Sequence, residues 1–409
     1  MQPAVIPSPS ESPLRRTAEQ LQTLDALMPG IHEHIDRLSA LVDELAERSA
    51  TPEDLDTLRQ ELRRLVDTLT FAELTGLVYV VGQAINALDS CSHPELYTAS
   101  MSDAIAGMLT VLPAYLSLLA DGEPGCPALL LMSVNALRLS MNRSPVSAPE
   151  IFAATVGADL IERSGPEPCG QNPGDLQAFA KRYRVGIMHA TLAVLHGGDT
   201  QKPLMALTRV AEKLEAAATT ESIARSWWVL RALFMVMTQS TSLPGESRPL
   251  LLRIESQLRV LAAAGESPEV IDAHRLVAGQ ALYLLGRTES LPEGLPGEVM
   301  RVYDLAHRVV SPLEQERLQR ALGDVGSQAL AGVTATIRND LQMVKESLDV
   351  MSRMAHPAVD ELKLLLNVVE GICGTLAILD RADWLQQMEE AAGRISQAQF
   401  LEQLELFGQ

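Results

Sequence analysis

Apolar residues recur along this chain at the three- and four-residue intervals of amphipathic helices. Two narrow stripes follow one another near the start. The first consists of Ile31, Ile35, Leu38, Val42 and Leu45, and the second of Leu55, Leu58, Leu62, Leu65 and Leu69. Such stripes are typical of the inner seams of antiparallel helix bundles. Between the two stripes, Thr51 before Pro52 predicts a helix N-cap with proline at the first helical position.

A similar pair of stripes lies further along the chain, the first offset by 306 residues and the second by 307. Its first member consists of Ile337, Leu341, Val344, Leu348 and Met351, and its second of Leu362, Leu365, Val369, Ile372, Leu376 and Leu379. A proline-containing turn separates the stripes in both copies. This internal repeat predicts two related four-helix bundles that flank a different middle region.

Proline- and glycine-rich stretches divide the chain into expected parts. The start is rich in Pro and Ser, and "RSGPEPCGQNPGD" forms a second break. The expected parts are a disordered tail at 1–18, a helical bundle at 19–145, a linker at 146–175, a helical middle domain at 176–326 and a second bundle at 327–409.

The composition supports an all-α fold class. The residues are 47% hydrophobic but only 4% aromatic, which favours helices over strands. The most apolar segments, 126–141 and 227–237, contain Asn135, Arg138 and Arg231 and are too short to span a bilayer. We expect buried core helices there and no membrane insertion.

Charge and cysteine content narrow the function classes. The net charge of −19 argues against binding to nucleic acid, which needs a basic surface, and against anionic lipid. The four cysteines are scattered, as in proteins with reduced thiols, and the chain does not start like a signal peptide. These features predict a cytoplasmic protein.

The stripes also indicate which positions point outward. At about 100° per residue, Asp67 lies opposite the centre of its stripe, and Gly374 has the same place in the second copy. Each precedes a Thr-Leu pair, which begins at Thr68 in one copy and at Thr375 in the other. These four residues are the candidate functional positions.

The segments "VDTLTFAELTG" and "CGTLAILDRADW" resemble the second helix of histidine-phosphotransfer (Hpt) domains, which carries an exposed His followed by x-Leu-Lys-Gly. Asp67 and Gly374 take the His position, and only the Leu of the motif is kept. The Lys and Gly positions hold Thr70 and Phe71 in the first copy. The resemblance therefore implies two degenerate Hpt-like bundles without the phosphoacceptor.

A wider resemblance rests on "IRNDLQMVKESLDVMSR" (337–353), on "GTLAIL" (374–379) and on "YRVGIMHATLAVLHGGDTQKPLMALTRVAEKL" (183–214). These segments resemble the FimL family of type IV pilus regulators and the degenerate N-terminal region of ChpA-type pilus chemotaxis kinases. The resemblance implies a non-catalytic bacterial scaffold for twitching motility and cyclic-AMP-linked signalling. Its implied partners are proteins: a response-regulator receiver domain, a polar hub protein such as FimV, and the adenylate cyclase pathway. It also implies recruitment to the cell pole.

Two other functions stay open at this point. One is phosphotransfer through an atypical acceptor, although Asp67 has no acidic Mg²⁺ pocket in sequence, and Thr68 and Thr375 lack a basic neighbour. The other is a tetratricopeptide-like adaptor, for which 176–326 shows no clear 34-residue repeat. The histidines have no companions at metal-ligand spacing, so we expect no catalytic, metal or cofactor site.

Overall fold

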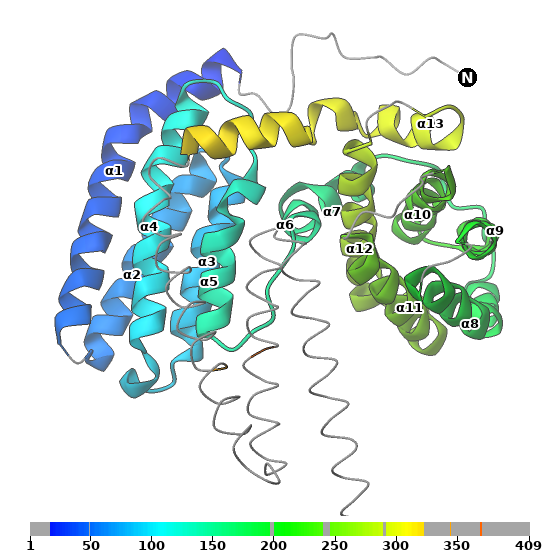
Figure 1. The fold of residues 1–409 in the computed structure, drawn as a ribbon, viewed down its shortest axis with the longest axis horizontal. Coiled ribbons are helices and arrows are strands. Elements are labelled where there is room, and N and C mark those ends of the chain that lie inside the picture. The colour runs from blue at the N-terminus through cyan, green and yellow to red at the C-terminus, as the bar shows by residue number, and fades with distance from the viewer. Residues whose placement is uncertain are drawn as a thin grey trace, which may run out of the picture.

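The computed structural model describes residues 17–322, except for 49, 197–199, 240–245 and 289–291, together with Val344 and Val369. These residues form two helical lobes that lie side by side (Figure 1). The described part is built from helices without strands, which confirms the all-α fold class. The expected tail before residue 17 lies outside the described residues. So does the expected second bundle, apart from the two valines.

The first lobe consists of five longer helices. They are α1 (Ala18–Glu47), α2 (Pro52–Phe71), α3 (Thr75–Ser90), α4 (Ala99–Ala120) and α5 (Leu131–Ser140). They pack as a ring in the order α1–α2–α3–α5–α4. The four-helix arrangement expected at 19–145 differs from this ring because Val134 and Leu137 of α5 are fully buried between α3 and α4.

Local sequence explains why α1 and α2 form where they do. All ten residues of their predicted stripes are buried in the core of the lobe. The side chain of Thr51 caps α2 by accepting the N–H of Asp54, whose carboxylate accepts the N–H of Thr51 at 2.9 Å. Pro52 occupies the first turn. The structure thus confirms the predicted N-cap.

The polar residues that interrupt the apolar segment at 126–141 hold the chain that follows it. Buried Asn135 exchanges two hydrogen bonds with the backbone of Val146, at 2.7 and 2.9 Å. Arg138 donates from Nε to the carbonyl of Ser144 at 2.7 Å. These bonds give hydrogen-bond partners to backbone groups of the connector after α5. Without them, burial of these polar groups would be costly.

The segment expected as a linker, 146–175, contains packed helices. They are α6 (Ala148–Phe152), the π-helical turn η3 (Ala153–Gly157) and α7 (Ala158–Arg163). All three lie against α12 (Pro268–Gly286) of the second lobe. The two backbones nearly touch where they cross, since a Cβ on Gly157 would lie 2.8 Å from the Cα of Gly279. Residues 148–163 therefore belong to the packed body of the molecule.

The second lobe repeats the ring of the first. Its other long helices are α8 (Pro173–His196), α9 (Gln201–Ala217), α10 (Glu221–Gln239) and α11 (Ser247–Ala264). The packing order is α8–α9–α10–α12–α11, which is the cyclic order of the first lobe. Because α11 returns to α8, the ring is closed. Tetratricopeptide repeats instead stack as an open solenoid, so the architecture disfavours that alternative.

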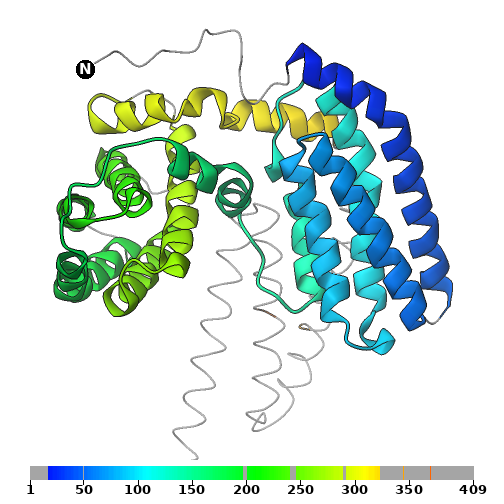
Figure 2. The ribbon, with the colours of Figure 1, turned by 180° about the vertical axis from the view of Figure 1, so that it is seen from behind.

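A last helix joins the two lobes. After α13 (Leu295–Val302), residues 312–322 form a helix, here called the return helix, that crosses from the second lobe over the first (Figure 2). Leu318 and Leu322 are buried in the core of the first lobe. Arg317 donates two hydrogen bonds to the carboxylate of Glu123 at 2.6 and 2.7 Å. The return helix therefore fastens the lobes together.

Among the described helices, only α4 is long and apolar enough to cross a membrane by length and composition, and half of its most apolar window is buried. Its apolar residues fill the first lobe between α1 and α5. The segment at 126–141 covers the short helix η2 (Pro127–Leu130) and α5, and the segment at 227–237 lies in α10. Apolar residues of these helices also line the cores.

Candidate functional site

Asp67, to which the Hpt resemblance assigns the position of the histidine, lies near the end of α2. Asp67 is exposed, as its place opposite the buried stripe predicts. Thr68 is half-buried, and its hydroxyl donates to the carbonyl of Arg64 at 3.0 Å. The hydroxyl of Thr70 likewise donates to the carbonyl of Val66 at 2.7 Å. Both threonine hydroxyls thus already have acceptors inside their own helix.

The helix ends immediately after this position. Glu73 adopts a left-handed conformation with φ 55°, its N–H donates to the carbonyl of Thr70, and the N–H of Leu74 donates to the carbonyl of Leu69 at 2.9 Å. These bonds form a Schellman C-cap, and buried Leu69 and Leu74 supply its usual apolar contact. Asp67 therefore lies immediately before the last turn of α2, which ends at Phe71.

This location opposes phosphoryl chemistry. The last turn of a helix carries unpaired carbonyls and the negative end of the helix dipole, which disfavours added negative charge. A phosphoryl group on Asp67 or Thr68 would add negative charge close to this end of the helix. The geometry of α2 therefore suits contact with another protein better than acceptance of a phosphoryl group.

An aromatic residue completes the surface around Asp67. Phe71 is 73% exposed and lies four residues after Asp67, so the two side chains share one face of α2. Arg63, one turn earlier, and Thr70 are exposed on the same side. We call Arg63, Asp67, Thr70 and Phe71 the α2 face. The sequence analysis noted Phe71 only as a departure from the motif, although its position outside the Leu stripe was a signal that it faces outward.

The second copy of the slot lies outside the described residues. Gly374 and Thr375 therefore remain predictions from sequence. Two residues of the repeated stripes are described, and both are helical: Val344 is half-buried, and Val369 is 1% exposed. The burial of Val369 agrees with its place on the second predicted stripe.

The described residues hold no group of His, Cys, Asp and Glu that could bind a metal ion. His274 is the most deeply buried histidine of the described part, with its ring 5.8 Å from that of Trp227. Its Nδ1 lies 2.9 Å from the carbonyl of Val270, so this nitrogen carries the proton and donates. Burial lowers the pKa of His274 to about 4. The ring is a neutral part of the core.

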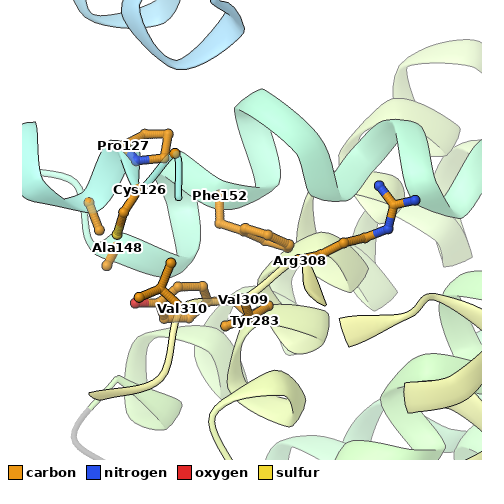
Figure 3. Close-up of a pocket in the computed structure, with 10 residues that line it drawn as sticks. Cys126, Pro127, Ala148, Phe152, Tyr283, Arg308, Val309 and Val310 are labelled. Atoms are coloured by element: carbon orange, nitrogen blue, oxygen red, sulfur yellow. The ribbon is translucent and has the colours of Figure 1, made fainter. Parts of the chain in front are cut away.

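A small pocket lies between the two lobes (Figure 3). Cys126 comes from the first lobe, Phe152 from α6 and Tyr283 from α12, and the rings of Phe152 and Tyr283 are 5.6 Å apart. Burial raises the pKa of the Cys126 thiol to about 11. The thiol therefore stays protonated at neutral pH, whereas a cysteine acts as a nucleophile in its thiolate form. The pocket is a packing junction rather than a reactive site.

The comparisons with known proteins bear on the second lobe. Residues 172–317 match the family described as the FimL scaffold protein second domain. This range extends from the start of α8 into the return helix. No curated protein and no solved structure was found to match the chain. The second lobe is therefore similar to the second domain of the FimL scaffold, and this match supports a FimL-like protein.

Proposed function

We propose that this protein is a non-catalytic signalling scaffold that controls type IV pili and twitching motility, together with cyclic-AMP-linked chemosensory signalling. The observation that carries the proposal is the match of residues 172–317 to the second domain of the FimL scaffold. Its partners would be a receiver domain, a polar hub protein such as FimV and components of the adenylate cyclase pathway. The protein would act in the cytoplasm and gather at the cell pole.

The α2 face supports docking as the mechanism. A receiver domain that recognises phosphotransfer bundles would meet Asp67 and Phe71 where the reactive histidine would otherwise stand. Exposed Phe71 offers the aromatic anchor that protein interfaces favour. The end of α2 offers no chemistry that would compete with binding, because the hydroxyl of Thr68 is bonded within the helix.

The cellular test is deletion of the gene in the native bacterium. We expect smaller twitching zones and a lower cyclic-AMP reporter signal, both restored by the wild-type gene. A deletion strain with normal twitching and normal cyclic AMP would overturn the proposed pathway.

The biochemical test uses a purified receiver domain of the same bacterium and the exchange Asp67→Arg. This change reverses a charge on the α2 face and should weaken receiver binding at least about fivefold, while Asp43→Arg, at an exposed position of α1, should leave it unchanged. Incubation with the phosphorylated receiver should leave the scaffold unlabelled on a Phos-tag gel. Transfer of phosphate to the wild-type protein would instead support the phosphotransfer alternative.

A further inference from the structure

Helix α8 carries an apolar stripe on its outer side, away from the lobe core. Val185, Met188 and Leu192 are 57%, 38% and 41% exposed. At about 100° per residue they fall within roughly 60° of one another, about 150° from the buried face formed by residues such as Ile187 and Val194. The helix is therefore apolar on two opposite sides. Core packing accounts for only the inner one.

Basic residues surround this outer stripe. Lys181 continues the stripe one turn earlier, and Arg182 and Arg184 flank it on its two sides. All three are exposed, and none makes an ion pair with any residue in the described part of the chain. In contrast, many arginines elsewhere are paired with carboxylates, as Arg317 is with Glu123. We call Lys181, Arg182, Arg184, Val185 and Met188 the α8 patch.

The sequence around the patch contains no acidic residue. No Asp or Glu occurs between Asp175 and Asp199, in a chain with 52 acidic residues and a net charge of −19. At physiological ionic strength a charge acts over about 8 Å, so a ligand on the α8 patch senses the local cations more than the distant acidic surface. The patch is a locally basic site on an acidic protein.

We propose that the α8 patch binds an acidic amphipathic helix of a partner protein. The stripe at 185, 188 and 192 has the spacing with which two helices pack side by side, and the flanking cations would pair with carboxylates beside the partner's apolar residues. Figure 1 shows α8 at the outer edge of the second lobe, where such a helix can approach.

The same chemistry suits an anionic lipid surface less well. A bilayer is flat and would bring the wider acidic surface of the protein close to the headgroups, whereas a helix of about 10 Å diameter covers the patch alone. The apolar stripe also lacks the Trp and Phe that anchor interfacial helices. We therefore favour a protein helix as the occupant.

This inference rests on the proposed scaffold role, to which it adds one class of partner. The α8 patch lies on the second lobe, whereas the α2 face lies on the first (Figure 1). Receiver binding by the Asp67 variants and peptide binding by the α8 variants can thus fail separately. If one binding test fails, the other can still be interpreted.

The test measures fluorescence anisotropy with a designed 18-residue peptide that has leucines at helical spacing and glutamates beside them. The full-length protein should bind this peptide with a micromolar Kd, which weakens as salt is added. A matched peptide with lysines in place of the glutamates should bind at least about tenfold more weakly. Equal binding of the two peptides would overturn the proposal.

Variants then locate the binding site. Reversing the three cations (Lys181→Glu, Arg182→Glu, Arg184→Glu) should weaken the acidic peptide at least about tenfold and strengthen the lysine peptide. Val185→Ser with Met188→Ser should weaken the acidic peptide at least about fivefold. The control reverses the same charge away from α8, at Arg37, Arg143 and Arg320, and should change neither Kd. Wild-type binding by both α8 variants would contradict the assignment.

Two further measurements separate the other occupants. A benzophenone amino acid at position 185 of the purified protein should give no cross-link until an acidic helix is added. Cross-links to residues 323–409 of the same chain, or to a second copy, would show that the patch is already covered and would overturn the proposal. Flotation with vesicles of phosphatidylcholine and phosphatidylglycerol should leave the protein unbound. If the protein floats with the vesicles and the α8 variants do not, the α8 patch binds membrane and the proposal is overturned.

Discussion

At the residue scale, a half-buried glutamate and a buried histidine of the second lobe respond to pH in opposite directions. Glu215 of α9 lies 3.3 Å from Arg231, yet burial outweighs this ion pair and raises the pKa of Glu215 to about 7. His274 of α12 has its pKa lowered to about 4 by burial, against the opposing effect of its hydrogen bond to Val270. Burial disfavours the charged form in both cases. It therefore favours the protonated, neutral carboxyl of Glu215 and the deprotonated, neutral ring of His274.

The first prediction concerns Glu215→Gln. Between its ordinary pKa of 4.5 and about 7, the folded protein binds a proton that the unfolded chain releases, so the free energy of unfolding falls as pH rises through this window. The amide should remove this slope and add on the order of 1–3 kcal/mol at pH 8. Urea unfolding at pH 5 to 8 measures it. Glu212→Gln, on the exposed side of the same helix, is the control and should keep most of the slope, because burial raises the pKa of Glu215 more than the charge of Glu212 does.

The second prediction concerns His274→Leu. The unfolded chain takes up a proton near pH 6.5 and the folded protein only near 4, so the free energy of unfolding falls as pH drops between these values, by up to about 3 kcal/mol. Leucine should abolish this acid sensitivity, whatever its effect on stability at pH 8. In the wild type the slopes of Glu215 and His274 offset one another where their windows overlap. An unchanged acid slope in the leucine variant would contradict the assignment.

At the scale of elements, the crossing of η3 and α12 depends on two glycines. The Cβ that any other residue would add to Gly157 falls 2.8 Å from the Cα of Gly279, and backbone cannot move aside as a flexible side chain can. This contact binds residues 148–163 to the second lobe. It also explains why part of the expected linker is packed rather than free.

The third prediction compares two glycine-to-alanine exchanges. Gly157→Ala should lower the free energy of unfolding by about 1–3 kcal/mol through overpacking. Gly186→Ala is the matched control, because Gly186 is exposed in α8 and a Cβ there has no neighbour within 4 Å. It should gain about 0.5–1 kcal/mol from helix propensity. Thermal unfolding followed by circular dichroism measures both, and equal effects would refute the close crossing.

At the scale of the whole molecule, the return helix decides whether the lobes act as one body. Two rings with the same cyclic order would otherwise meet mainly through residues 148–163 and the small junction around Cys126. Leu318 and Leu322 insert into the first lobe from a segment that follows the second lobe in sequence. The surfaces assigned to two partners, the α2 face and the α8 patch, are thereby held at a fixed separation.

The fourth prediction tests this fastening. Leu318→Asp places an unpaired charge in the core of the first lobe and should release the return helix. Limited proteolysis should then cut between 304 and 322, while the helical circular dichroism of both lobes persists. Gln319→Asp, exposed on the same helix, should leave the protease pattern unchanged. If both variants resist cleavage equally, the lobes do not depend on this helix.

The sequence predicts the local features well, because helix geometry depends on nearby residues. The Leu stripe of α2, the cap at Thr51 and the outward position of Asp67 are all observed. It predicted less of the candidate surfaces. Phe71 was noted only where it broke a motif, and the outer stripe of α8 was hidden because its period coincides with that of the inner stripe.

The sequence by itself determined the all-α class, which faces of α1 and α2 are apolar, and the outward position of Asp67. These follow from the 3.6-residue period of the helix and from residue identity. Only the tertiary structure decided that each ring closes with five helices, that 148–163 packs on α12, and that the return helix joins the lobes. An apolar helix face must pack against another apolar surface, and many surfaces of suitable shape could serve. Which one is used is decided by contacts between segments distant in sequence, which the local pattern does not specify.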